Sequence, residues 1–376
     1  MPVLIKSVES RRDFRTFATF ANKLYKGNRY YVPTMPGDDL AVFDRRKNAA
    51  YEFCEAEFFL AYKDDKVVGR VAAIINNKAN AAWNVKQVRY GWIDFIDDIE
   101  VSSALLDKVA CWGRERGMTT IAGPLGFTDF DPEGMLVEGF DQLGTMAMIY
   151  NHEYYHHHLE KLGYVKETDW LEYRITIPDE LPERHIKLAQ LVMERNKLKI
   201  VKKTRSQIRK ERYGQKLFQL INETYCNLYG YSLLSEKQID QYVDQYLGLL
   251  DLKMVSFIEN EDGELIAAGV TMPSLSDALQ KCGGNIFPVG WWYLIKNMYI
   301  KKPETLDLLL VGVKPEYQNK GVNTLLFLDL FRNFKEMGFK YAETSAELET
   351  NVKVQQMWSG FDKVQHKRRR VYGKEL

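Results

Sequence analysis

Hydrophobic residues recur with two different periods along the chain. In residues 11–25 apolar side chains return every three or four positions, which predicts an amphipathic helix. In residues 56–75 they form two apolar runs on either side of the turn KDDK, which predicts a β-hairpin. Segments of both kinds continue to residue 373, so the pattern predicts a mixed α/β chain.

The same succession of elements occurs twice. In the first half we expect a strand at 3–10, the helix at 11–25, the hairpin at 56–75, a strand at 89–98, a helix at 101–117, a strand at 118–127, a helix at 150–164 and a strand at 169–177. In the second half we expect a strand at 198–204, helices at 206–229 and 235–249, a hairpin at 253–272, a strand at 306–313, a helix at 322–337, a strand at 340–346, a helix at 349–358 and a strand at 365–373.

Asn151 and Asn351 open equivalent late helices in these two series. A tandem duplication of one α/β domain explains the repeat. We therefore expect one domain at 1–178, a linker or helix at 179–197, and a second domain at 198–376.

Composition narrows the classes of function. Lys and Arg total 52 against 51 Asp and Glu, a net charge of +1, so the chain shows no electrostatic footprint for nucleic acid. The four cysteines form no CxxC pair, which favours a cytoplasmic protein over a disulfide framework or a cysteine-rich zinc site. No signal peptide and no apolar run of about 18 residues is recognisable. We expect a soluble protein with no transmembrane segment, while contact with a membrane surface stays open.

The stretch VGVKPEYQNKGVN, residues 311–323, ends an apolar strand and leads directly into a helix. The first N–H groups of a helix have no intrahelical acceptor and lie at the positive end of its dipole. Gly321 lets a bulky anion approach the main chain without meeting a Cβ atom. An anion site is predicted here, although an ordinary strand-to-helix turn has the same ingredients.

The motif QNKGVN, residues 318–323, resembles the Q/R-x-x-G-x-G/A loop with which GNAT N-acyltransferases bind the pyrophosphate of acyl-coenzyme A. The later ETNVKVQQMWSGF is similar to another segment of that family, so the resemblance covers about 198–376. It implies acyl-CoA, acetyl or longer, as co-substrate and no metal. The implied binding residues are Val311, Gly312, Val313, Gln318, Asn319, Lys320, Gly321, Val322, Asn323 and Asn351.

The first half resembles the same family more distantly. Its HHHLEKLGYVKETDW looks like the closing helix and strand, but GWIDFIDD runs into VSSALLD without a glycine loop. The resemblance implies two tandem GNAT-like domains, each a mixed, mostly antiparallel central sheet flanked by helices. The N-terminal copy is degenerate because it lacks the pyrophosphate loop.

Transfer of an acyl group to an amine requires a base, because an alkylamine with a pKa of about 10.4 is mostly protonated near pH 7. Asp307 stands where some GNAT enzymes place a general-base carboxylate, and Glu304 is its neighbour. A solvent-facing carboxylate at a strand entrance is the alternative. The N–H groups of 311–313 would polarise the thioester carbonyl, and Tyr317 and Tyr372 are candidates to protonate the leaving thiolate.

The loop 123–141 is long and rich in glycine, aromatic and acidic residues. Loops of this length are often functional. We expect its carboxylates to bind a cationic amine substrate; a surface loop packed on its own phenylalanines is the alternative. The four residues are Asp129, Asp131, Glu133 and Glu138.

Three further segments each allow more than one interpretation. HEYYH, residues 152–156, matches the zincin motif H-E-x-x-H, but its position on the closing helix favours a polar helix face beside a pocket. The apolar segment 282–300 is expected to pack in the core, with a wall of an acyl channel or of the domain interface as the alternatives. KRRR at 367–370 indicates either contact with an anion or an edge strand protected from pairing.

These observations predict an acyl-CoA-dependent N-acyltransferase whose acceptor is a small-molecule or lipid amine, such as a sphingoid base. Asn323 and Trp358 depart from the family pattern, since a glycine or alanine and a proton-donating tyrosine are usual there. A non-catalytic GNAT-shaped protein that binds acyl-CoA or a metabolite therefore stays open. Fem-type aminoacyl transfer also stays open, although the net charge indicates no basic groove. The sequence specifies neither acyl chain length nor acceptor nor oligomeric state.

Overall fold

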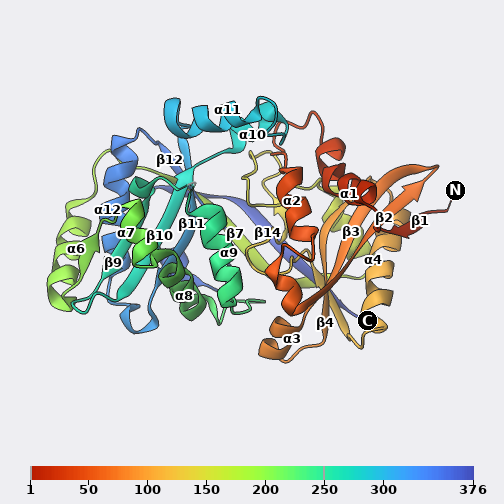
Figure 1. Cartoon of the computed structure of the whole chain (residues 1–376), viewed down its shortest axis with the longest axis horizontal. Helices are drawn as coiled ribbons and strands as arrows, with labels where there is room; N and C mark the ends of the chain where they lie inside the picture. The colour runs from red at the N-terminus through yellow and green to blue at the C-terminus, as the bar shows by residue number, and fades with distance from the viewer. Residues whose placement is uncertain (1, 249) are drawn as a thin grey trace.

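Strands from both halves of the chain form one continuous sheet (Figure 1). The computed structural model describes residues 2–248 and 250–376. The first half contains β1 (Leu4–Ser7), α1 (Arg11–Leu24), α2 (Pro36–Phe43), β2 (Cys54–Lys63), β3 (Lys66–Asn76), α3 (Asn77–Trp83), β4 (Gln87–Phe95), α4 (Ile99–Arg114), β5 (Thr120–Gly123), β6 (Met135–Glu138), α5 (Tyr154–Lys161) and β7 (Val165–Thr176). The second contains α6 (Glu183–Asn196), β8 (Lys199–Val201), α7 (Arg205–Lys210), α8 (Tyr213–Tyr225), α9 (Glu236–Tyr246), β9 (Val255–Glu259), β10 (Leu265–Pro273), α10 (Ser276–Cys282), α11 (Gly290–Ile295), β11 (Thr305–Val313), α12 (Asn323–Glu336), β12 (Tyr341–Thr344), β13 (Glu347–Leu348), α13 (Val352–Met357) and β14 (Lys363–Glu375).

The halves exchange their last strands. The strand order is β1-β2-β3-β4-β5-β14-β7-β12-β11-β10-β9-β8, with β6 on β14 and β13 on β7. β14 of the second half pairs with β5 of the first, with Tyr372 opposite Gly123. β7 of the first half pairs with β12 of the second, with Ile175 opposite Ala342. Each half therefore completes its sheet with a strand from the other.

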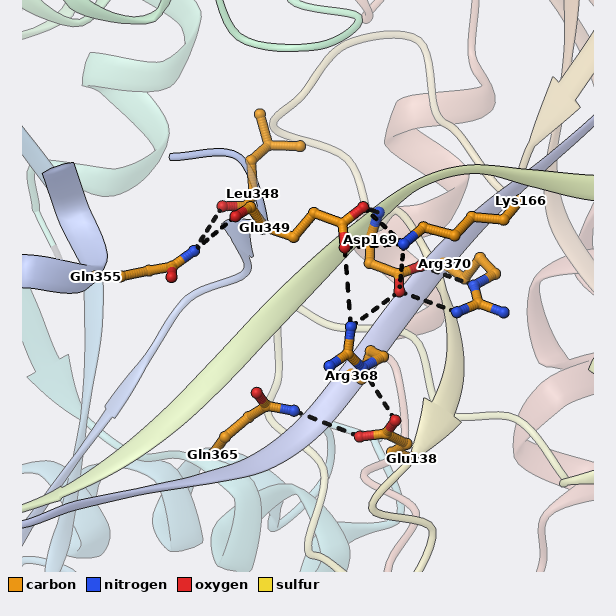
Figure 2. Close-up of polar contacts among 9 residues, drawn as sticks. All are labelled: Glu138, Lys166, Asp169, Leu348, Glu349, Gln355, Gln365, Arg368 and Arg370. Atoms are coloured by element: carbon orange, nitrogen blue, oxygen red, sulfur yellow. Dashed lines mark hydrogen bonds and ion pairs between the residues drawn. The ribbon is translucent and has the colours of Figure 1, made fainter. Parts of the chain in front are cut away.

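A charged cluster on β7 and β14 fixes this central crossing (Figure 2). The buried carboxylate of Asp169 accepts two hydrogen bonds from Arg370, at 2.7 and 3.0 Å, and one from Arg368 at 3.0 Å. Lys166 bridges Asp169 and Glu349. Hydrogen bonding to the two arginines and Lys166 outweighs burial and lowers the pKa of Asp169. The KRRR segment thus lies on a central strand, so the interpretation as an edge strand is wrong.

Helices cover both faces of each half, as the alternation of apolar residues requires. In β3, Val71 and Ala73 belong to the core under α4, whereas Ala72 and Ile74 pack with α1 and α2. In the second half, α6 and α12 cover one face, and α7 and α8 cover the other. The predicted α/β class with a repeated order of elements is confirmed.

Local boundaries differ from the sequence predictions at several places. The helix expected at 206–229 is two helices, because Arg212 adopts a left-handed conformation with φ of 55° between α7 and α8. The helix expected at 235–249 ends at Tyr246, and residue 249 lies outside the described residues. Segment 282–300 was expected in the core, but many of its large apolar side chains are exposed.

Candidate acyl-transfer site

β11 and β12 separate part-way along their length. Parallel pairing runs from Thr305 opposite Tyr341 to Leu308 opposite Thr344, and β12 ends there. β11 continues to Val313, and a β-bulge at Leu309 shifts its register against β10. A parallel pair that opens in this way exposes main-chain groups of β11 inside the fold.

The open edge of β11 can be assigned from its hydrogen bonds. The N–H of Lys314 donates to the carbonyl of Ile266 on β10 at 2.9 Å. Because hydrogen-bonding direction alternates along a strand, the main-chain groups of Gly312 also face β10, and those of Val311 and Val313 face the gap. Side chains already reach this edge, since Tyr225 Oη donates to the Val311 carbonyl at 3.1 Å and Gln318 Nε2 to the Val313 carbonyl at 3.2 Å.

The loop after β11 presents main-chain donors. Within residues 2–248 and 250–376, the N–H groups of Asn319, Gly321, Val322 and Asn323 donate to no protein acceptor. Asn319 and Gly321 have positive φ angles of 61° and 78°, which turn successive N–H groups toward a common side. Helix α12 begins at Asn323 and adds its dipole. An anion can therefore be bound by this loop.

A cavity of about 310 Å³ lies beside this loop. Asn323, Thr324 and Phe327 of α12 and Met357 of α13 line it. Arg184 and other residues of α6 complete it and supply a cation near the helix start. Asn351 caps α13 by accepting a hydrogen bond from the Val354 N–H at 3.4 Å.

Asp307 is a buried carboxylate next to the point where the strands separate. Leu306 and Leu308 pack with phenylalanines of α12, so Asp307 points to the opposite face of the sheet. Burial raises the pKa of Asp307 to about 7, and the negative charge of Glu343, directly across on β12, raises it further. Its Oδ1 atom has no hydrogen-bond partner within the described ranges. A buried carboxyl group with a free oxygen and a pKa near neutrality has the properties of a general base.

A second buried carboxylate, Glu347, was not predicted from the sequence. Trp358 Nε1 donates to its Oε1 atom at 2.7 Å, whereas Oε2 has no partner among residues 2–248 and 250–376. Burial raises the pKa of Glu347 to about 7 in spite of the hydrogen bond from Trp358. Burial raises the pKa of Tyr225, whose hydroxyl binds Val311, to about 12, and the charge of Glu347 also contributes to this rise. Trp358, which cannot replace the usual tyrosine as an acid, instead positions this carboxylate.

Three carboxylates of the first half gather against the second half. Burial raises the pKa of Asp129 to about 6 and that of Asp131 to about 7. Burial, followed by the charge of Asp129, raises the pKa of Glu133 well above its usual value. Arg89 is the neighbouring cation and donates to the carbonyls of Gly126 and Gly230 at 3.2 and 2.9 Å. This acidic cluster, Asp129 with Asp131 and Glu133, therefore lies where both halves meet.

The acidic cluster lies on the same face of the sheet as Asp307. Phe130, within the cluster's loop, packs with Phe218 and Tyr242 of α8 and α9, as does Leu310 of β11. Burial, and after it the negative charge of Asp129, raises the pKa of Tyr231, which lies near Tyr225. A continuous row of side chains thus connects the acidic loop to the open edge of β11.

The other predicted site residues lie elsewhere. Glu304 is exposed and forms an ion pair with Lys340 at 2.5 Å. Tyr372 is buried on β14 beside β5 and donates to Glu160, so β7 and β12 separate it from β11. Glu138 on β6 pairs with Arg368 (Figure 2). Tyr317 is half-buried in the pyrophosphate-type loop, with the Lys320 ammonium over its ring.

The equivalent opening in the first half is filled. β4 and β5 pair only from Gln87 to Arg89, and at the end of β4 the Phe95 N–H donates to Tyr155 Oη at 2.9 Å. The Phe95 carbonyl accepts from Tyr154 Oη at 2.6 Å. Helix α4 then begins beside Asp98, whose carboxylate caps it. Tyrosines and an acidic helix start thus replace the free amides and the glycine loop of the second half.

Histidines in HEYYH and directly after it pack against neighbouring side chains. His158 contacts Ser102 Oγ at 3.0 Å and Asp97 at 3.1 Å, and His152 stacks on Tyr154. No group of three or more His, Cys, Asp or Glu side chains suited to a metal is found in the described part of the chain.

Solved structures with the same arrangement cover the whole chain. A tandem GNAT protein from the clavulanic acid biosynthesis pathway matches with a TM-score of 0.54 and 12% identity, over 99% of this chain and 98% of that one. A GCN5-related glucosamine N-acetyltransferase region of a fungal β-N-acetylglucosaminidase matches with a TM-score of 0.56 and 14% identity, over 99% of this chain and 38% of the other. The chain has the tandem GNAT fold.

Two bacterial proteins are similar in sequence to this chain. Protein YghO of Escherichia coli is 25% identical over 99% of this chain and 95% of its own length. The bacterial ceramide synthase of Caulobacter vibrioides is 25% identical over 88% of this chain and 86% of its own. No family model matches.

Proposed function

We propose that this tandem GNAT chain is an acyl-CoA-dependent N-acyltransferase whose acceptor is a long-chain lipid amine of the sphingoid-base type. The observation that carries the proposal is a set of main-chain N–H groups on two adjoining segments. The N–H groups of Val311 and Val313 face the gap beside β11, and the unpaired N–H groups of Asn319 and of 321–323 lie in the turn that follows. Donors in this arrangement can bind acyl-CoA, whose arm has the thioester at one end and the pyrophosphate at the other.

The loop would bind the pyrophosphate, and the open edge of β11 would bind the amide-containing arm. The N–H groups of Val311 and Val313 can donate to carbonyls placed in the gap, including the thioester carbonyl, whose oxygen gains negative charge during attack. Glu347 Oε2, which lacks a partner, can accept an N–H of the arm. Trp358 keeps that carboxylate in position.

We assign Asp307 as the general base. The acceptor's ammonium is attracted by the acidic cluster and loses a proton to Asp307 Oδ1, directly or through water. The neutral nitrogen attacks the thioester carbon and the new C–N bond forms as the C–S bond breaks. The leaving thiolate takes the second proton from the nitrogen, which gives the amide and free coenzyme A thiol. Asp307 suits the role because its pKa of about 7 lets it be ionised before the reaction and protonated after it.

The lipid nature of the acceptor has two supports. One is the similarity to the ceramide synthase of Caulobacter vibrioides, which extends over most of both chains. The other is the apolar, methionine-rich cluster around Leu309, two residues after Asp307 on the same strand; it includes Met272, Leu275 and Met298. A long alkyl chain requires apolar surface of this kind near the reacting amine.

Isothermal titration calorimetry with acetyl-CoA and palmitoyl-CoA tests cofactor binding, and release of free coenzyme A in the presence of sphinganine tests turnover. We expect binding and amine-dependent thiol release, and retention of binding but loss of release in Asp307→Asn. Binding without release with any amine would instead indicate a non-catalytic acyl-CoA-binding protein. If neither acyl-CoA binding nor thiol release were observed, the proposal would be wrong.

A further inference from the structure

The segment between β10 and β11 lies across one end of the molecule. α10 and α11 pass over both halves at the top of Figure 1. Gln280 donates to the carbonyls of Arg29 and Tyr31 in the first half, at 2.8 and 3.0 Å. Asn297, in the π-helical turn that follows α11, donates to the Ser274 carbonyl in the second half at 2.7 Å. The segment is therefore anchored to both halves of the chain.

One face of α11 and its π-helical extension packs inward. Leu294 and Met298 contact the apolar cluster that contains Leu275, Leu279 and Leu309. The opposite face carries large apolar side chains, each 41–82% exposed. These are Phe287, Val289, Trp291, Trp292, Ile295, Tyr299 and Ile300. We call these seven residues the α11 patch.

The charges within residues 278–303, which carry the α11 patch, have one sign. Residues 278–303 contain four lysines, Lys281, Lys296, Lys301 and Lys302, and no aspartate or glutamate. The whole chain, by contrast, has nearly equal numbers of acids and bases. Lys296 and Lys301 are exposed beside the patch. A partner that binds this surface should therefore present apolar groups to the patch and negative charges to the lysines beside it.

We propose that the α11 patch docks on the surface of an anionic phospholipid bilayer. Tryptophan, tyrosine and phenylalanine are enriched where proteins meet the boundary between headgroups and acyl chains, and lysines beside an amphipathic helix are attracted to anionic headgroups. The patch combines both features on one short helical segment. No helix within 2–248 or 250–376 is long and apolar enough to cross a membrane, so the contact is with the surface.

The position of the patch connects the membrane with the proposed reaction; this step rests on the proposed function. Met298 and Leu294 point from α11 into the cluster that reaches Leu309. The Ser274 carbonyl accepts the hydrogen bond from Asn297, and the Ser274 side chain lies beside the carboxyl group of Asp307. A lipid amine leaving the bilayer at α11 would thus meet apolar side chains that continue to Asp307, so its alkyl chain need not cross water.

Vesicle cosedimentation tests docking without acyl-CoA or turnover. The full chain is mixed with vesicles of phosphatidylcholine alone or of phosphatidylcholine with phosphatidylglycerol. We expect binding to the anionic vesicles, weakening as salt rises, and at least about a tenfold lower partition coefficient for Trp292→Glu. Leu191→Glu is the matched control, because Leu191 is 62% exposed on α6, outside the patch, and it should bind like the unchanged chain.

The result that overturns docking is equal binding by Trp292→Glu and Leu191→Glu, or no preference for anionic vesicles. A patch covered by a second copy would instead give a dimer in sedimentation velocity that Trp292→Glu dissociates, with no vesicle binding. Transfer to a short water-soluble amine is assayed separately. If transfer persists without vesicle binding, docking is refuted and the proposed function stands. If vesicles are bound but no amine is acylated, docking stands and the proposed function is refuted.

Discussion

The indole N–H of Trp358 donates a 2.7 Å hydrogen bond to Oε1 of Glu347, and both side chains are buried. Replacement of Trp358 by phenylalanine would leave a buried carboxylate oxygen without its donor. We expect Trp358→Phe to lower the free energy of unfolding by about 1–3 kcal/mol, measured by urea denaturation. In the control Trp291→Phe, which removes an indole donor from an exposed site, the change should stay below about 0.5 kcal/mol. Equal effects would show that the Glu347 hydrogen bond contributes nothing.

Asp307→Asn should lower kcat by about 10²–10⁴-fold, the usual contribution of a general base. In the unchanged enzyme kcat/KM should rise with pH through about 7, because only the ionised carboxylate accepts a proton, and this limb should be absent from the variant. A full-rate variant with an unchanged pH profile would contradict the assignment and leave Glu347 as the candidate. Glu304→Gln is the matched control, since its ion pair with Lys340 lies at the exposed strand entrance.

The same substitution has a predictable effect on stability. Burial raises the folded-state pKa of Asp307 from 3.8 to about 7, so between these values the folded state binds more protons than the unfolded state. By linkage, this group makes stability fall as pH rises from about 4 to about 7. Asp307→Asn removes that dependence, so the variant should gain stability relative to the unchanged chain at pH 8 but not at pH 4. Urea unfolding at both values measures the difference.

Gly321→Ala should weaken acyl-CoA binding. An added Cβ would lie 3.1 Å from Val192 Cγ2, and the φ of 78° is strained for alanine, so the loop must shift its free N–H groups. A lost hydrogen bond to a charged group corresponds to about 1.5–3 kcal/mol, or about tenfold to a hundredfold in Kd. Gly263→Ala has a similar φ of 77° in an open hairpin turn and should lose stability alone. Calorimetric titration that gave the same Kd for both variants would exclude the loop as the pyrophosphate site.

Asp129→Asn should raise the KM for a cationic amine by roughly threefold to tenfold, since Asp129, with a pKa of about 6, is mostly ionised at neutral pH and the substitution removes that charge from the cluster. The Kd for acyl-CoA should not change, because the loop at 319–323 is unaffected. Glu138→Gln is a suitable control: the same segment of sequence supplies it, but it binds Arg368. Steady-state kinetics with the amine varied would show equal KM values if the cluster did not bind the acceptor.

Fragments 1–178 and 179–376 should not fold separately. Without the partner fragment, β5 lacks β14 and β12 lacks β7, and unpaired central edges of this kind aggregate. Refolded together, the fragments should give one cooperative unfolding transition by circular dichroism. Two independently folded fragments would show that the strand exchange is dispensable for each half.

The sequence predicted those features that depend on local pattern. Gly321 precedes a helix within a motif that resembles the GNAT loop, and the same resemblance implies a base at Asp307, so both could be proposed without coordinates. Glu347 and Tyr225 could not, because their importance arises from contacts with Trp358 and Val311 that only the fold creates. No signal in the segment around Glu347 distinguishes it from Glu349, which instead pairs with Lys166.

The sequence pattern could not predict the strand order of the sheet either. β7 and β14 have similar lengths and alternation, so periodicity cannot say which half either strand completes. The apolar run 282–300 satisfies the pattern of a core segment as well as that of an exposed amphipathic one, and only the inward direction of Leu294 and Met298 separates the two. Charge density was the available clue, since 278–303 has lysines and no acids.

The exchange of β7 and β14 has a consequence for biosynthesis. β5 emerges from the ribosome long before the strand that will cover it, so the N-terminal half must wait, with one edge open, for residues 363–375 to be translated. Nascent chains of this protein should therefore depend on chaperones during most of their synthesis, and a premature stop near codon 360 should destroy both halves at once.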